Sequence, residues 1–363
     1  MNSERSSKPR ALGWRRARAL PALGLLFGLL AGTLALGAPA TPESPLRSLQ
    51  YTPRPRNETV TWQKEVRAKL LDLLSITDLI KGKKDIPFNP MEVRSWDMGE
   101  YVVKDLTLQS TPGRRMEVVL TLPKGTTGRC LAVVCIGGHG SQRFTTYTKG
   151  QAFGELPANT KDSSPVYKGF AAELARRGYI TISTSVSQHK VCEEGRTLMG
   201  ERLWDLMRCV DYLDSLPQVD KTRIGCAGLS LGGEMVMWLA AVDERLQAAV
   251  SCGFLTTMDH IAQHGCPCWN FPGLRQLVDF ADIYALIAPR SLECQNGQKE
   301  PPTDFTPELA SRAMTEIRPV YAAFDCAQKP ILDIHGGKHE VDLPALLAFF
   351  EQSFKRSNAT KSR

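Results

Sequence analysis

Ser230 lies in a Gly-x-Ser-x-Gly pattern at residues 228–232. A short apolar run precedes the pattern at 224–227 and a helix-length apolar segment follows from Met235, so we expect a strand, a sharp turn and a helix. Glycines two positions before and after the serine allow the backbone to double back tightly. Such a turn holds the hydroxyl clear of the sheet and directs the N–H groups of the next helix toward an oxyanion. The pattern therefore predicts a nucleophilic serine, although glycine-rich turns also occur as plain connections or phosphate loops.

A nucleophilic serine needs a base and a carboxylate that orients the base. Two histidines follow the last expected strand: His335 directly at its end, and His339 in a glycine-flanked loop before the final helix. We predict His339 as the base, with His335 as the alternative. Glu300 follows the preceding strand, and we predict it as the acid. The alternative carboxylates are Asp304, Asp333 and Asp259.

An oxyanion hole also requires two backbone N–H groups near the serine. The first is expected from Leu231, the residue after the nucleophile. For the second, the continuous apolar strand at 130–136 runs directly into the segment Gly-Gly-His-Gly at 137–140. Glycine-rich backbone at a strand end can approach a ligand closely, so we predict the N–H of His139 as the second donor. A simple tight turn is the alternative for this segment.

Strand and helix patterns alternate at short intervals around these residues, which is typical of an α/β fold with a mostly parallel, doubly wound sheet flanked by helices. An antiparallel pair around a turn at 111–113 would begin the sheet, and a helix at its N-terminal side would form an extension. The expected strands lie at residues 101–108, 116–122, 130–136, 179–186, 224–227, 248–254, 291–295 and 331–334. The expected helices lie at residues 62–80, 168–177, 201–213, from 235 onward and at 343–354.

From about Trp62 to its end, the sequence resembles bacterial α/β-hydrolases grouped around acetyl xylan esterases and dienelactone-hydrolase-like proteins. Besides the serine pattern and the glycine-rich segment, the motifs that carry the resemblance are Gly200-Glu201-Arg202, Asp220-Lys221-Thr222-Arg223-Ile224-Gly225, Asp243-Glu244-Arg245, Leu286-Ile287-Ala288-Pro289-Arg290, Asn296-Gly297 and His339. The sequence departs from the family at two points. Gly137-Gly138 stands where relatives usually have His-Gly, and Glu300 stands where they usually have Asp.

The resemblance implies the α/β-hydrolase fold and a triad in the order Ser230, Glu300, His339. It implies a serine carboxylic-ester hydrolase that works through an acyl-enzyme and needs no cofactor, with a small-molecule ester or an acyl group on a plant polysaccharide, such as acetyl on xylan, as substrate. Two alternatives use the same fold: a serine peptidase like the prolyl oligopeptidases, and a binding module that has lost its catalytic activity. No repeat of propeller-blade length accompanies the domain.

The first forty residues are typical of an export signal, since basic residues precede a charge-free apolar run at 19–38 that ends in Ala38-Pro39-Ala40. A periplasmic or secreted protein is expected; an uncleaved leader would instead be a membrane anchor. Residues 41–60 are expected to be an extended lead-in. No linker rich in Pro, Gly and Ser interrupts residues 61–356, so they are expected to form a single domain.

The formal net charge is +7, but the first forty residues carry six Lys or Arg and one Glu, so about +2 remains on the rest. This near balance gives no basis for nucleic-acid binding. An exported chain with ten cysteines could form disulfides, while Cys130, Cys135 and Cys226 fall in apolar runs and are expected to be buried. His260, His264, Cys266 and Cys268 are close in sequence, but their spacing differs from structural zinc sites, so we expect a loop or cap near the cleft and no metal.

Overall fold

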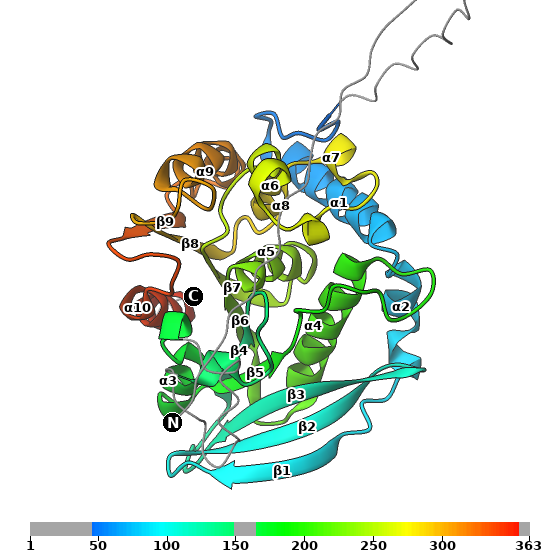
Figure 1. Cartoon of the computed structure of the whole chain (residues 1–363), viewed down its shortest axis with the longest axis vertical. Helices are drawn as coiled ribbons and strands as arrows, with labels where there is room; N and C mark the ends of the chain where they lie inside the picture. Colours follow the sequence, from blue (N-terminus) through cyan, green and yellow to red (C-terminus); the bar gives the residue numbers. More distant parts are fainter. Residues whose placement is uncertain (1–45, 149–164, 356–363) are drawn as a thin grey trace, which may run out of the picture. The chain divides into compact units, whose positions relative to one another are not determined.

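The computed structural model describes residues 46–148 and 165–355, and all structural statements refer to these residues. They form a nine-stranded mixed sheet in the order β1-β2-β3-β5-β4-β6-β7-β8-β9 (Figure 1). The strands are β1 Met91–Asp97, β2 Tyr101–Thr111, β3 Arg114–Pro123, β4 Cys130–Ile136, β5 Ile180–Thr184, β6 Val219–Leu229, β7 Leu246–Cys252, β8 Ser291–Gly297 and β9 Pro330–His335. Strands β5, β4, β6, β7, β8 and β9 are parallel, and β3 joins β5 in antiparallel pairing.

Helices cover both faces of the sheet, as the alternation of strands and helices predicts. They are α1 Arg56–Leu73, α2 Thr77–Gly82, α3 Phe170–Arg176, α4 Leu198–Ser215, α5 Leu231–Val242, α6 Met258–His264, α7 Leu274–Leu277, α8 Phe280–Ala285, α9 Pro307–Ala322 and α10 Leu343–Phe354. Figure 1 shows α4 and α5 on one side of the central strands and α3 and α10 on the other. Within β4, Val134 and Ile136 pack into one hydrophobic cluster with α4 and α5, whereas Val133 and Cys135 pack into the other with α3 and α10. The sheet is therefore doubly wound.

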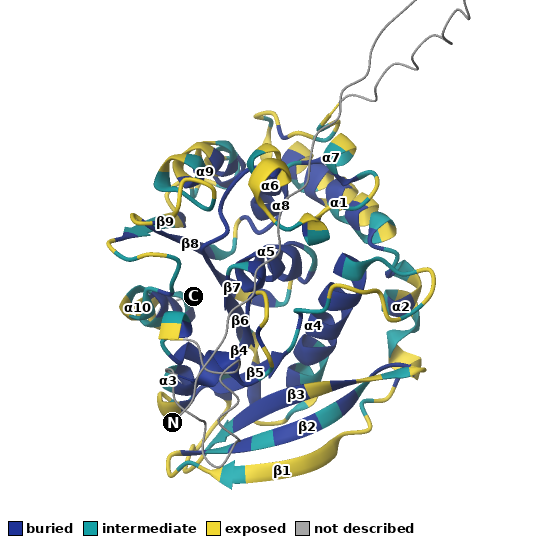
Figure 2. Ribbon diagram, viewed as in Figure 1, coloured by how far each residue is buried: buried dark blue, intermediate teal, exposed yellow. Residues whose placement is uncertain are grey.

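The central strands position the site because their carboxyl-terminal halves are buried. Apart from the half-buried Leu131, all residues of β4 and β5 are buried, and so is the second half of β6 (Figure 2). Parallel pairing of Ile136 with Gly228, and of Gly228 with Ser251, brings the carboxyl ends of β4, β6 and β7 to one edge. Ligand sites of open α/β sheets lie at this edge. The loops that follow these strands carry the residues singled out by the sequence.

Several element boundaries match the sequence-based expectation, including β4 at 130–136 and α10 at 343–354. The single helix expected at 62–80 is wrong, because the chain forms α1 and α2 with Ser75 between them at a φ of 57°. A left-handed residue interrupts the helical hydrogen bonds. Helix α1 also begins at Arg56, inside the segment 41–60 that we expected to be extended.

Strand β1 and helix α9 were not expected. Strand β1 is an edge strand that is exposed along almost its whole length, so it carries no hydrophobic alternation (Figure 2). Helix α9 does have sequence signals, since Thr306 caps its N-terminus and Pro307 occupies the first turn. No helix in the described part of the chain is long and apolar enough to cross a membrane. The leader expected at residues 1–40 lies outside the described residues.

Candidate active site

Ser230 stands at a strained turn between β6 and α5, with φ 63° and ψ −125°. The glycines around it are required by close packing. A Cβ on Gly228 would lie 2.5 Å from the carbonyl oxygen of Gly232, and a Cβ on Gly232 would lie 2.3 Å from the carbonyl oxygen of Ile136. Strain of this kind persists only where the surrounding structure holds it, and it is concentrated at functional sites. The turn that the sequence predicts is therefore present.

The serine backbone is fixed on both sides of the turn. Its N–H donates to the carbonyl oxygen of Cys252 at the end of β7, at 2.9 Å, and its own carbonyl accepts the N–H of Glu234 at 3.0 Å. Helix α5 starts directly after the serine, so the free N–H groups of its first turn face the same edge of the sheet. The N-terminus of a helix carries a partial positive charge. The Ser230 hydroxyl therefore lies beside such a charge.

His339 and Glu300 contact each other at this edge of the sheet. The Nδ1 atom of His339 lies 3.0 and 3.2 Å from the two carboxylate oxygens of Glu300. The Glu300 side chain is 1% exposed and that of His339 is 30% exposed, so the acid is hidden behind a ring that reaches the surface. Phe305 stacks on the imidazole at a centroid distance of 5.4 Å. Gly253 leaves room for the ring, since a Cβ there would lie 2.7 Å from His339 Cε1.

The residues named as alternatives to His339 and Glu300 lie in other surroundings. His335 is buried, and its Nδ1 accepts the N–H of Gly337 at 3.2 Å. Asp333 has a buried carboxylate oxygen without a partner, and burial raises the pKa of this carboxyl group. Asp259 pairs with Arg275 at the surface. The remaining alternative, Asp304, lines the same cavity as His339, but its carboxylate accepts a hydrogen bond from Thr303 at 3.0 Å.

Ser230 and His339 open into one cavity of about 200 Å³. Its apolar walls include Leu231, Phe254 and Trp269. Within the described ranges, no hydrogen bond joins the serine hydroxyl to the imidazole. Catalytic hydrogen bonds are often long in structures without substrate and tighten when substrate binds. The arrangement therefore places a hydroxyl, an imidazole and a buried carboxylate around one small space.

The predicted oxyanion donors lie on either side of this space. In the described part of the chain, neither the N–H of Leu231 nor that of His139 has a protein acceptor. The preceding N–H, that of Gly138, is already bound to the Tyr167 hydroxyl at 2.7 Å. A Cβ on Gly138 would lie 3.0 Å from Ser230 Cβ, so this loop touches the serine turn. The role of the two free N–H groups remains a prediction.

Two further titratable side chains, those of Glu234 and His139, line the cavity. The sequence did not identify either side chain as a titratable group of the site. Glu234 is buried one turn after the serine, and its desolvation raises the pKa of the carboxyl group to about 8, against the opposing charge of Arg202. The neutral form of this acid therefore prevails at pH 7. Burial of the His139 ring, followed by the charges of Arg202 and His189, lowers its pKa to about 4. The imidazole of His139 is neutral at the same pH.

The cysteines and histidines near the cavity are grouped differently from the expectation. His260 binds the carbonyl oxygen of Thr303 at 2.9 Å, and His264 lines the cavity. Cys266 and Cys268 instead meet His139 and His189, and the four possible ligand atoms lie within 4.8 Å of one another. No signal in the sequence could have joined these two histidines to the cysteines, because they come from separate loops. All ten cysteines are free, and Cys130, Cys135 and Cys226 are buried as expected.

The doubly wound sheet and the serine turn at the end of β6 define the fold class of this chain as that of the α/β-hydrolases. Comparison with known proteins agrees with this class. The sequence model of the prolyl oligopeptidase family, Peptidase_S9, matches residues 191–264, which include Ser230. The Bacillus subtilis (strain 168) protein YtaP, provisionally named a hydrolase, is 26% identical over 225 residues, which is 56% of this chain and 72% of YtaP.

Two solved structures share the fold at low sequence identity. A Bacteroides fragilis protein provisionally named an acetyl xylan esterase has a TM-score of 0.62 and 17% identity, with 80% of this chain and 79% of that chain covered. The glucuronoyl esterase from Solibacter usitatus has a TM-score of 0.62 and 16% identity, with 87% and 99% covered. At these identities, the similarity establishes the fold.

Proposed function

We propose that the chain is a serine carboxylic-ester hydrolase with Ser230 as nucleophile, His339 as base and Glu300 as the orienting acid. The serine oxygen attacks the ester carbonyl while His339 Nε2 takes the hydroxyl proton. The N–H groups of Leu231 and His139 stabilise the oxyanion. His339 then gives its proton to the leaving alcohol, and a water molecule, deprotonated in the same way, releases the acid from the acyl-enzyme.

The observation that carries this proposal is the pairing of His339 with a nearly unexposed Glu300 carboxylate, 3.0 Å from Nδ1. A carboxylate at Nδ1 keeps the proton on that nitrogen, so Nε2 is left free to act as a base. It also stabilises the imidazolium that forms when the serine is deprotonated. The strained serine turn, and the cavity that Ser230 shares with His339, support Ser230 as the nucleophile.

We assign the substrate to esters with a small acyl group, with acetyl groups on a plant polysaccharide such as xylan as the leading class. The cavity volume of about 200 Å³ supports a small acyl group, since pockets for drug-sized ligands start at roughly 300 Å³. The names of the two solved neighbours, an acetyl xylan esterase and a glucuronoyl esterase, support a carbohydrate ester. The export signal predicted at residues 1–40 supports a location outside the cytoplasm, where such a polymer is accessible.

Hydrolysis of p-nitrophenyl acetate by the full chain tests the proposal, with Ser230→Ala as the inactive variant. Ser95→Ala on the exposed edge strand β1 is the matched control and should retain wild-type activity. We expect turnover that is lost in Ser230→Ala, faster rates for acetyl than for octanoyl esters, and acetate release from acetylated xylan. A folded wild-type chain that is inert on all of these esters would refute the assignment and favour a binding module.

A peptidase is the second candidate, because the prolyl oligopeptidase family model matches the segment around Ser230. Peptidase and esterase use the same serine mechanism and differ in the leaving group. A proline-specific p-nitroanilide peptide, tested beside p-nitrophenyl acetate, separates the two. Cleavage of the peptide amide at a kcat/KM above that of the acetyl ester would favour the peptidase.

A further inference from the structure

We propose that His139, His189, Cys266 and Cys268 form a binding site for one zinc ion at the rim of the cavity. Each residue offers one ligand atom, and the four atoms lie within 4.8 Å of one another. Two imidazole nitrogens and two thiolates are a ligand set that zinc binds in tetrahedral geometry. This binding site shares His139 with the proposed oxyanion hole, but its test does not depend on ester hydrolysis.

The distances between the possible ligand atoms fit this geometry. His139 Nε2 lies 3.2 Å from Cys268 Sγ, and His189 Nε2 lies 3.5 Å from Cys266 Sγ. Zinc bonds of usual length at a tetrahedral angle would separate a nitrogen and a sulfur by about 3.6 Å. The two imidazole rings are inclined by 29° to each other at a centroid distance of 5.4 Å. Small side-chain shifts therefore suffice to bring all four atoms to one ion.

The surroundings of the cluster hold its members in place. Arg202 on α4 donates one guanidinium N–H to Cys268 Sγ at 3.5 Å and another to the carbonyl oxygen of Gln188, the residue before His189. Metal sites commonly have such a second layer of hydrogen bonds, which orients the ligands. Two thiolates would also balance the charge of Zn²⁺.

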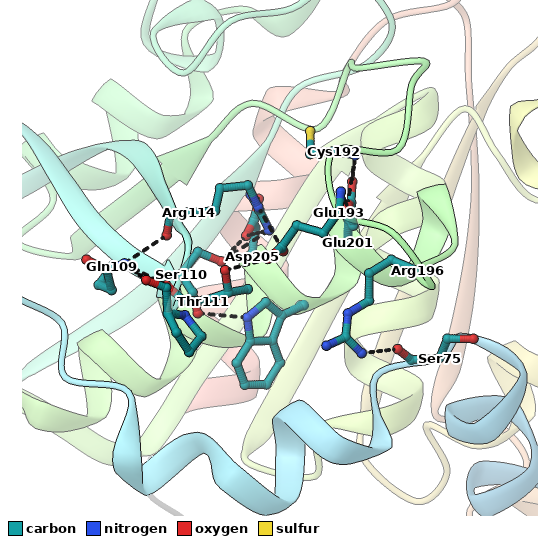
Figure 3. A network of polar contacts seen from close by, with 12 residues as sticks. Ser75, Gln109, Ser110, Thr111, Arg114, Cys192, Glu193, Arg196, Glu201 and Asp205 are labelled. Carbon is teal, nitrogen blue, oxygen red and sulfur yellow. Dashed lines mark hydrogen bonds and ion pairs between the residues drawn. The ribbon is translucent and has the colours of Figure 1, made fainter.

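The loop that carries His189 is anchored further along as well (Figure 3). The Glu201 carboxylate accepts the N–H of Cys192 at 2.9 Å and that of Glu193 at 2.7 Å. Arg196 donates to the carbonyl oxygen of Ser75 at 2.7 Å. The loop is therefore held to α4 and to the segment between α1 and α2. A preformed loop lowers the ordering cost of metal binding.

An ion at this place would join three separate segments: the loop after β4, the loop after β5, and the 266–268 segment between α6 and α7. Cys266 and Cys268 line the cavity that contains Ser230 and also a second cavity of about 420 Å³ on their other side. The ion would have a path of entry from the second cavity, as a metal site requires. It would close one wall of the first cavity and hold the His139 loop beside the serine turn.

Metal binding by the full chain tests this proposal. We expect one Zn²⁺ per chain after dialysis against equimolar Zn²⁺, measured by elemental analysis. Addition of Co²⁺ to the metal-free wild-type chain should produce the visible absorption of tetrahedral cobalt together with thiolate-to-cobalt charge transfer. His189→Ala and Cys268→Ser should each weaken Zn²⁺ binding by at least roughly 100-fold, because each removes a direct ligand. Circular dichroism of both metal-free variants checks that they remain folded.

Matched controls lie close to the cluster. Cys192→Ser removes an exposed thiol three residues after His189, and His264→Ala removes an imidazole from the neighbouring helix α6. Both should bind Zn²⁺ as the wild type does. Octahedral cobalt spectra, or zinc affinity that survives in a Cys266→Ser/Cys268→Ser double variant, would overturn the proposal. So would a purified chain in which two of the ten thiols are missing and peptide mapping finds a disulfide between Cys266 and Cys268.

Discussion

Replacing Glu300 with glutamine should remove most of the activity while preserving the fold. Glutamine has nearly the same volume, and the site that holds Glu300 is almost closed to solvent. The amide has no charge to stabilise an imidazolium, and its NH2 group, if it faces His339 Nδ1, would force the proton onto Nε2. In that tautomer the imidazole cannot accept the serine proton.

The magnitude follows from the distance between the two groups. Opposite unit charges 3.0 Å apart, as His339 Nδ1 and Glu300 Oε1 are, attract each other by about 5.5 kcal/mol at an effective dielectric constant near 20. Since about 1.4 kcal/mol corresponds to a factor of ten in rate, complete loss of this term would slow the reaction by about 10⁴-fold. The amide retains part of the hydrogen bond, so we expect kcat/KM to fall by about 10³- to 10⁴-fold.

The assay is p-nitrophenyl acetate hydrolysis by the full chain, with Asp304→Asn and Asp333→Asn measured beside Glu300→Gln. Circular dichroism and thermal melts establish that all three variants are folded. We expect the two aspartate variants to stay within about tenfold of the wild type, because neither carboxylate contacts His339 in the structure. A folded Glu300→Gln variant within tenfold of the wild type would falsify the acid assignment, and a larger loss in Asp304→Asn would transfer the role to that residue.

Three further changes test the packing and electrostatics of the site. Gly232→Ala should lower the free energy of unfolding in urea by about 3 kcal/mol, because its Cβ would lie 2.3 Å from a backbone oxygen of β4, whereas Gly128→Ala, with nothing within 4 Å, should have almost no effect. The folded-state pKa of Glu234, about 8 against an ordinary 4.5, means that unfolding releases a proton between these values, so wild-type stability should fall as the pH rises from 5 to 8. In paired urea titrations, the free energy of unfolding of Glu234→Gln should not show this fall with pH, so the variant should gain about 3 kcal/mol relative to the wild type between pH 5 and pH 8. Equal pH slopes in the two proteins would contradict the raised pKa of Glu234. Arg114→Met should cost about 3 kcal/mol in the same assay, because it leaves the buried Asp205 carboxylate of Figure 3 without its 2.7 Å ion pair.

The parts of the fold that the sequence predicts well are those where one physical requirement dominates. Strand β4 is a continuous apolar run because both of its faces are covered. The serine turn needs glycine at 228 and 232, and no other residue type fits there. Glu300 and His339 follow β8 and β9, which are neighbouring parallel strands, so their loops must leave the sheet side by side. Strand order along the chain thus predicts this contact before any distance is known.

Other features depend on packing that no local pattern encodes. Ser75 is an ordinary residue in the sequence, yet its left-handed backbone divides one expected helix into two. His260 and His264 are one helical turn apart, and their rings lie 4.8 Å from each other, so closeness in sequence favoured them as partners of Cys266 and Cys268. The residues that contact Cys266 and Cys268 instead, His189 and His139, lie 77 and 129 residues away in sequence. Only the topology of the sheet brings their loops together.

The unusual Gly-Gly pair at the start of the oxyanion loop has a structural reason that the sequence does not reveal. A Cβ on Gly137 would lie 2.5 Å from the Cβ of Ser141, and a Cβ on Gly138 would lie 2.8 Å from the carbonyl oxygen of Leu229. Ser141 cannot move away easily, because its hydroxyl binds that of Tyr167 at 2.8 Å, and the same tyrosine accepts the N–H of Gly138. The departure from the family pattern is thus consistent with a tyrosine and a serine that hold this loop against the serine turn. A side chain at 137 would displace Ser141, so close packing explains the glycine at this position.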